Sequence, residues 1–172
     1  MGVDGQRLDF AEFYRGSKDE CLFTVLVSVG DLDVAQELVA EAFARAWASW
    51  PRVSTHPAPV GWIVRTALNA NVSRWRRRRR EVSVPDPATV ADLPAAGGVI
   101  GGSVDPQIMA ALMRLPARQR QVVALRLFLD LDISRTAQVL GIAPGTVQSH
   151  QGRAIATLRG DLMAGRPQEN PA

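Results

Sequence analysis

The chain has 172 residues, of which 47% are hydrophobic, and this length suits one or two small domains with cores of their own. The single cysteine, Cys21, excludes a disulfide framework and a cysteine-based zinc site. The net charge of +3 hides four blocks of alternating sign, because residues 1–50 carry −5, 51–80 carry +8, 81–113 carry −4 and 114–172 carry +4. Two basic blocks separated by an acidic one predict two contacts with a polyanion.

The first predicted element is a helix, or a pair of broken helices, from Leu8 to Val29. Its expected role is structural, and its expected core residues are Phe10, Phe13, Leu22, Phe23 and Leu26. A turn at Gly30 follows. Asp31 and Asp33 are candidates to cap the N-terminus of the next helix.

The second predicted helix covers residues 33–50 and has a strong apolar stripe. Spacings of three and four residues place these side chains on one face: Val34, Leu38, Val39, Ala42, Phe43, Ala46 and Trp47. Glu37, Ala40, Glu41 and Ala44 fall toward the other face. Taken alone, the segment is typical of a core helix with a solvated acidic face.

Residues 51–59 contain three prolines and form a predicted loop, and a helix is predicted from Gly61 to Arg80. The residues expected to pack inward are Trp62, Ile63, Ala67 and Val72. Another face carries Arg65, Asn69, Arg76 and Arg80.

This helix ends in a run of five arginines, residues 76–80, directly after Trp75. Arginine side chains suit phosphates, and exposed aromatic rings stack on unpaired bases. The segment therefore predicts contact with nucleic acid. A disordered arginine tail is the alternative for the run, and a core position fits Trp75 equally well.

Residues 81–107 lack apolar periodicity and contain four prolines and the sequence GGVIGG, which predicts a flexible acidic linker. The predicted fold is therefore all-α, with two small helical domains at residues 1–80 and 108–164. Residues 165–172 are predicted to be a disordered tail.

The second domain has the spacing of a helix-turn-helix between Leu115 and Leu158. Ala137 allows two helices to cross closely, Gly141 can adopt a positive φ at the end of the first helix, and Val147 packs the second helix back on the first. Pro144 suits an early helix position, and Thr146 can help to satisfy free N–H groups there. We interpret the segment as a DNA-binding unit in preference to an ordinary helical hairpin.

The sequence contains no GxxxxGK phosphate-binding loop and no GxSxG nucleophile motif, and His56 and His150 are remote from any plausible set of metal ligands. These features predict a protein that is not an enzyme and has no metal or cofactor. No signal-like segment follows Met1 and no stretch is long enough to span a membrane, so a cytoplasmic protein without membrane insertion is expected.

Taken together, four motifs in order resemble the extracytoplasmic-function sigma factors of the sigma-70 family, the two-domain initiation subunits of bacterial RNA polymerase, and are similar to actinobacterial members. They read GDLDVAQELVAEAFARAWASW, GWIVRTALNANVSRWRRRRR, LPARQRQVVALRL and GIAPGTVQSHQGRAIATLR. The resemblance implies that the chain directs core polymerase to specific promoters. The implied partners are the β′ clamp and β flap of the polymerase core, promoter DNA and, in some cases, an anti-sigma factor.

The resemblance also implies roles for individual positions. It assigns clamp docking to Glu37, Leu38, Glu41 and Phe43. It assigns melting and reading of the minus-ten element to Arg65, Asn69, Arg74, Trp75, Arg76 and Arg77. It assigns recognition of the minus-thirty-five element in the major groove to Thr146, Gln148, Ser149, His150 and Arg153.

Several positions differ from the usual family pattern. Ala40 stands in place of Gln, and Leu68 stands in place of a basic residue. In the recognition helix, Gln148 replaces Lys and His150 replaces Arg. Gln151 replaces an apolar residue there, and Gly152 replaces Ser. Two alternatives remain at this point. One is an activator of the response-regulator type, in which TVKSH is common, and the other is a nucleic-acid-coating or anti-termination protein.

Overall fold

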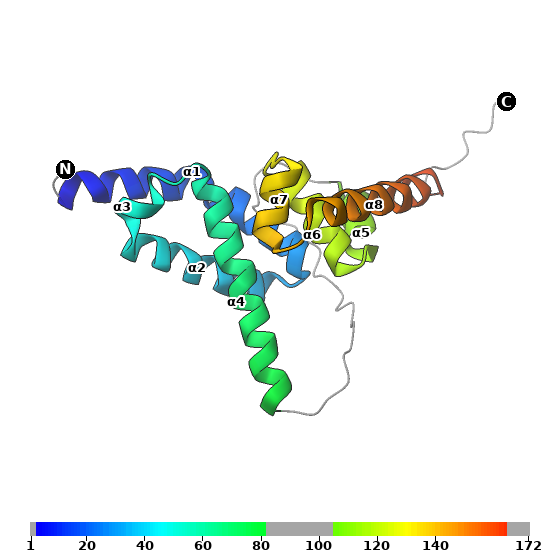
Figure 1. Cartoon of the computed structure of the whole chain (residues 1–172), viewed down its shortest axis with the longest axis horizontal. Helices are drawn as coiled ribbons and strands as arrows, with labels where there is room; N and C mark the ends of the chain where they lie inside the picture. Colours follow the sequence, from blue (N-terminus) through cyan, green and yellow to red (C-terminus); the bar gives the residue numbers. More distant parts are fainter. Residues whose placement is uncertain (1–2, 82–104, 165–172) are drawn as a thin grey trace.

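The computed structural model describes the backbone of residues 3–81 and 105–164, and the side chains of residues 9–74 and 105–163 (Figure 1). Every regular element in these ranges is an α-helix, as predicted. The central part of the predicted linker, residues 82–104, and the predicted tail, residues 165–172, lie outside the described residues. We refer to helices α1–α4 as the N-terminal unit and to helices α5–α8 as the C-terminal unit.

Helix α1 (Val3–Val29) is one unbroken helix, so the predicted alternative of a broken pair is wrong. It ends at Gly30, whose φ of +80° suits a residue without a Cβ, and the Gly30 N–H bonds to the Leu26 carbonyl at 2.7 Å. Asp31 then caps α2 (Leu32–Ala48), since its carboxylate accepts a bond of 2.9 Å from the Val34 N–H. The two helices are therefore joined by a tight turn.

Helix α2 buries most of its predicted apolar stripe against α1 and α4. Trp47 is an exception, because 43% of its surface is exposed and its ring lies beside that of Phe10 at the rim of the core. The predicted loop begins instead with a short helix, α3 (Trp50–Val53), which places Trp50 in the core at 5% exposure. Pro51 occupies an early position of α3, where a missing N–H costs no hydrogen bond.

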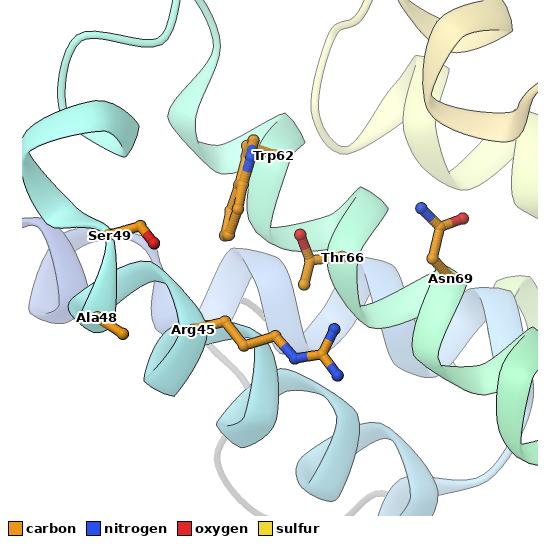
Figure 2. A pocket seen from close by; sticks show the side chains of 6 residues that line it. All are labelled: Arg45, Ala48, Ser49, Trp62, Thr66 and Asn69. Carbon is orange, nitrogen blue, oxygen red and sulfur yellow. The ribbon is translucent and has the colours of Figure 1, made fainter.

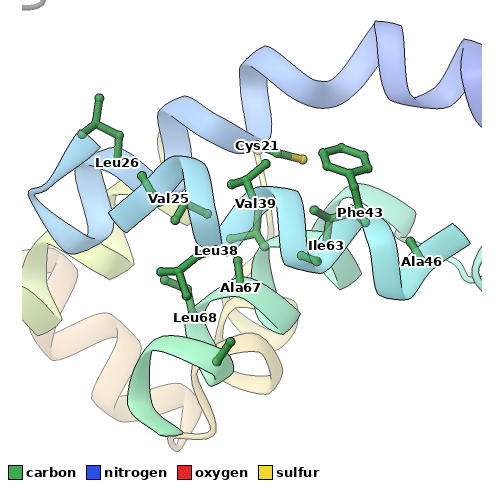
Figure 3. Packing of buried hydrophobic residues seen from close by; sticks show 14 of the residues in the cluster. Cys21, Val25, Leu26, Leu38, Val39, Phe43, Ala46, Ile63, Ala67 and Leu68 are labelled. Carbon is green, nitrogen blue, oxygen red and sulfur yellow. The ribbon is translucent and has the colours of Figure 1, made fainter. Parts of the chain in front are cut away.

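Helix α4 (Pro59–Glu81) packs on α1 and α2, and its C-terminal half projects away from the other helices (Figure 1). Ile63 and Ala67 are fully buried as predicted, whereas Val72 is exposed. Figure 3 shows the resulting core, in which Cys21 lies beside Val39 and Phe43. Burial, with a smaller effect from the charge of Glu20, raises the pKa of the Cys21 thiol to about 12.

The C-terminal unit consists of α5 (Pro106–Arg114), α6 (Ala117–Leu127), α7 (Ile133–Leu140) and α8 (Pro144–Ala164). Asp105 caps α5 by accepting a bond of 2.7 Å from the Gln107 N–H, and Pro106 takes the first helical position. The helical unit thus begins two residues before the predicted boundary. At the other end of α5, Arg120 donates to the Met113 carbonyl at 3.1 Å and satisfies a group that the helix leaves free.

The two units pack against each other, which the sequence did not predict. Val27 of α1 is fully buried in the core of the C-terminal unit, whereas Leu125 and Leu131 are buried in the core of the N-terminal unit. The rings of Phe23 and Phe128 meet edge to face with centroids 4.6 Å apart. We refer to these five residues as the inter-unit contact. It is mainly a contact of α1 with α6, and α4 touches α7 beside it (Figure 1).

Candidate nucleic-acid and polymerase interfaces

The predicted helix-turn-helix is present and its three diagnostic positions have the expected geometry. Gly141 has φ +65° and ends α7, and its N–H bonds to the carbonyl of Ala137. Ala137 is 5% exposed and Val147 is fully buried, and both pack with Val122 of α6. The turn therefore fixes α8 against the rest of the C-terminal unit.

Two glycines of this segment are expected to respond to alanine in opposite directions. Gly141→Ala should lower the free energy of unfolding by about 1 kcal/mol, because a Cβ is disfavoured at positive φ even though the site is open. Gly152→Ala should raise it by up to about 1 kcal/mol, because Gly152 lies inside α8 with no atom near the added Cβ. Urea unfolding of both variants measures the difference, and equal effects of the same sign would contradict this description of the turn.

Recognition-helix residues on the outer face of α8 are free to meet a partner. Thr146, Gln148, Ser149 and Arg153 are exposed. His150 differs from the prediction, because it is half-buried and its Nδ1 is buried without a hydrogen-bond partner in the described structure. Four of the five predicted recognition residues are therefore exposed, and His150 lies at the border between the exposed and the packed face of α8.

Helix α4 carries the predicted minus-ten residues, and three of their side chains belong to the described part of the chain. Arg65 and Asn69 are exposed, four residues apart. Arg74 lies farther along and donates to Glu37 of α2 at 2.5 Å. Leu68 is only 6% exposed, so this departure from the basic family pattern lies in the core. The side chains of Trp75, Arg76 and Arg77 lie outside the described residues.

A hollow of about 420 Å³ opens between the end of α2 and α4, and Asn69 lines it (Figure 2). Trp62, Thr66 and Asn69 follow one another along α4, while Arg45 and Ala48 of α2 and Ser49, directly after it, face them. The hollow thus combines a flat aromatic ring with amide, hydroxyl and guanidinium groups, which are the groups that stack on a base and bond to its edge. Sequence reasoning missed Arg45, Ser49 and Thr66, because helical periodicity does not show which residues of another helix will lie opposite.

The acidic edge of α2 is accessible, whereas half of its predicted docking residues are not. The side chains of Glu37 and Glu41 are 61% and 42% exposed, and each accepts a bond of 2.5 Å from an arginine, Arg74 and Arg45 respectively. Leu38 and Phe43 are 0% and 3% exposed and belong to the core. In this structure these two side chains hold α2 in the core, and the accessible part of the predicted docking set is Glu37 and Glu41.

Other kinds of site find no support among the described residues. None of them form a group of three or more acidic, histidine or cysteine side chains able to hold a metal ion. The His56 Nδ1 accepts a bond of 3.0 Å from the Ala58 N–H and thereby stabilises the turn before α4. Among the helices that the structure describes, none has the length and apolar character needed to cross a membrane.

Comparison with known proteins supports the same division of the chain. The family profile for sigma-70 region 2 matches residues 23–81, and the profile for sigma-70 region 4 matches residues 106–158. The RNA polymerase sigma-E factor of Streptomyces coelicolor is 31% identical over 160 residues, which cover 93% of this chain and 89% of the relative. The ECF RNA polymerase sigma factor SigW of Bacillus subtilis is 24% identical over 92% of this chain and 91% of its own length.

A solved structure also matches nearly the whole arrangement. It is the sigma factor RpoE of Bartonella quintana, crystallised in complex with the anti-sigma factor NepR. The match has a TM-score of 0.73 with 26% identity, and covers 92% of this chain and 99% of the other. Since the relatives match across both units in the same order, the chain belongs to the sigma-70 family, in its extracytoplasmic-function class of RNA polymerase sigma factors.

Proposed function

We propose that this protein directs core RNA polymerase to a specific set of promoters and starts transcription there. The observation that carries the proposal is the presence, in one chain, of a helix-turn-helix with an exposed polar face, a second helix with Arg65 and Asn69 exposed, and an accessible acidic helix edge, all within regions that match sigma-70. The polymerase core supplies the catalysis, so the chain itself needs no catalytic site. Its expected compartment is the cytoplasm, with the nucleoid as its location in holoenzyme.

The C-terminal unit is proposed to read the minus-thirty-five element. A helix fits the major groove of B-DNA, and Gln148 and Ser149 have short polar side chains suited to base edges. Arg153 lies one turn farther along α8 and suits a phosphate. The same unit is proposed to contact the β flap.

The N-terminal unit is proposed to melt and read the minus-ten element. Arg65 and Asn69 lie on the exposed face of α4, and the hollow beside Asn69 has the lining groups that an unstacked base requires. Trp75, Arg76 and Arg77 are proposed to extend this surface, where cationic side chains attract DNA regardless of sequence. Glu37 and Glu41 are proposed to dock α2 on the β′ clamp.

With the two units packed against each other, the protein is too compact to contact both promoter elements at once. Each base pair extends a duplex by about 3.4 Å, so elements centred ten and thirty-five base pairs upstream lie on the order of 80 Å apart. Helix α4 touches α7 in this structure, and α8 is only about 30 Å long. We infer that the inter-unit contact separates in holoenzyme. We propose that a protein that stabilises the contact would act as an anti-sigma factor on this chain.

The function is tested by mixing the purified chain with core polymerase of its source organism and a library of genomic DNA fragments. Formation of a complex that initiates RNA at a shared sequence would support the proposal. Sequence-specific DNA binding without core polymerase would instead favour the activator alternative, and binding without sequence preference would favour a coating protein. The family comparison argues against the activator in one respect, because residues 23–81, which lie before the helix-turn-helix, match sigma-70 region 2.

Asn69→Ala should weaken initiation by roughly 5- to 100-fold, since a side chain that reads a base is worth about 1–3 kcal/mol. Because Asn69 is exposed on a helix, alanine should not lower stability. Asn71→Ala, two residues away and outside the hollow, is the matched control. The measurement is open-complex formation at the best genomic promoter, and equal activity of the two variants would remove Asn69 from the site.

A further inference from the structure

The inward face of the recognition helix includes a half-buried amide, that of Gln151. Val147 and Ala154 are fully buried and Leu158 is half-buried, and these positions form the stripe by which α8 packs on the C-terminal unit. Gln151 lies on the same stripe, four residues after Val147 and three before Ala154. A half-buried amide at such a position is favoured when it has a hydrogen-bond partner within the protein.

Arg126 of α6 provides that partner. Its Nε donates to the Oε1 of Gln151 at 3.3 Å, across a sequence separation of 25 residues. Gln151 is one turn of helix from Gln148, which belongs to the proposed base-reading face. The position of the Gln151 side chain therefore bears directly on how α8 is rotated about its own axis.

The same guanidinium also holds the turn that precedes the helix-turn-helix. A second nitrogen of Arg126 donates to the carbonyl of Leu131. This turn contains Asp130 at φ +46°, the one non-glycine residue with positive φ in the described chain, and such a conformation persists only when its surroundings fix it. Arg126 thus ties α6, the turn into α7, and α8 together at one point.

We propose that Arg126 is a positioning residue for promoter recognition: by bonding to Gln151 and to the Leu131 carbonyl, it sets the rotation of α8 at which Gln148 and Ser149 meet the base edges. The inference rests on the proposed function, in which α8 reads the upstream element. Recognition of base edges depends on orientation, because the bonds to a base pair require their donors and acceptors in place. A phosphate contact tolerates rotation better. Loss of Arg126 should therefore reduce sequence discrimination more than it reduces total affinity.

The test uses holoenzyme and a panel of promoters derived from the best genomic fragment, with the upstream element intact or randomised. Arg126→Met and Gln151→Ala remove the bond from either end. Each should lower the preference for the intact over the randomised element by roughly fivefold or more, in the range that one base-edge contact supplies. The slope of log affinity against log salt should not change, since a half-buried arginine bonded within the protein neutralises no phosphate.

Arg118→Met is the matched control, because Arg118 also lies on α6 and also bonds to a glutamine, Gln121, at 3.2 Å, but this bond is exposed and stays within α6. It should keep the full preference. Unchanged discrimination in either Arg126→Met or Gln151→Ala would overturn the inference, and so would a flatter salt slope in Arg126→Met, which would make the arginine a phosphate contact. If Arg126→Met does not fold, the promoter preference of Gln151→Ala tests the inference by itself. A wild-type holoenzyme that ignores the upstream element would instead refute the proposed role of α8.

Discussion

Leu131→Asp is expected to separate the two units of the free protein. Leu131 is 7% exposed and packs into the core of the N-terminal unit, where an unpaired carboxylate would be strongly unfavourable. The cores within each unit do not depend on this side chain to the same degree, because α7 and α8 are held by Val122, Ala137 and Val147. The variant should keep its helical content while its radius of gyration, measured by small-angle X-ray scattering, increases by several ångströms.

The same variant should bind core polymerase more tightly than wild type, by roughly tenfold. A partner that requires the open arrangement has an apparent affinity reduced by the fraction of molecules that are open, and weakening the inter-unit contact raises that fraction. Leu127→Asp is the matched control, since Leu127 is on α6 close by in sequence and 67% exposed. An unchanged radius of gyration for Leu131→Asp, or an equal response of both variants, would show that the contact does not hold the units together in solution.

Reversing both charges of the α2 edge is expected to abolish holoenzyme formation. With Glu37→Arg and Glu41→Arg together, two attractive contacts become repulsive, and like charges across an interface cost several kcal/mol, so core affinity should fall by about a hundredfold or more. Protein stability should change little, because the exposed pairs of these residues with Arg74 and Arg45 are worth only about 0–1 kcal/mol each. Titration of labelled protein with core polymerase measures the effect.

A matched control separates docking from net charge. Glu12→Arg and Asp19→Arg make the same change of charge at exposed positions of α1. This variant should bind core polymerase normally. Normal binding by the α2 variant would remove Glu37 and Glu41 from the docking surface, and equal loss in both variants would point to a long-range charge effect.

The sequence was most informative where one residue type meets a specific backbone requirement. Gly141 adopts the positive φ that its position in the helix-turn-helix implied, and Asp31 caps α2 as its place before an apolar stripe indicated. The apolar periodicity of α2 likewise identified its buried face. In each case the signal is local, since it depends on residues within a few positions of one another.

The sequence was least informative where two distant segments meet. Periodicity marked Phe23 and Leu26 as apolar positions of α1, but it could not show that Phe23 packs against Phe128 of the other unit. The hollow beside Asn69 depends on Arg45 of α2 and on Ser49, which follows that helix, and the bond between Arg126 and Gln151 spans 25 residues. Leu38 and Phe43 received two assignments, because the apolar stripe marked them as core positions, as the structure shows, and the resemblance placed them in a docking set.

The reactivity of Cys21 with alkylating reagents reports on local unfolding of the N-terminal unit. It is the only thiol in the chain, it is fully buried between α1 and α2, and its pKa of about 12 leaves very little thiolate at neutral pH. An alkylating reagent can therefore modify it at an appreciable rate only when the packing around it opens. The modification rate in the free protein, compared with the rate in complex with core polymerase or an anti-sigma factor, would show how much each partner stabilises this core, without any label introduced into the protein.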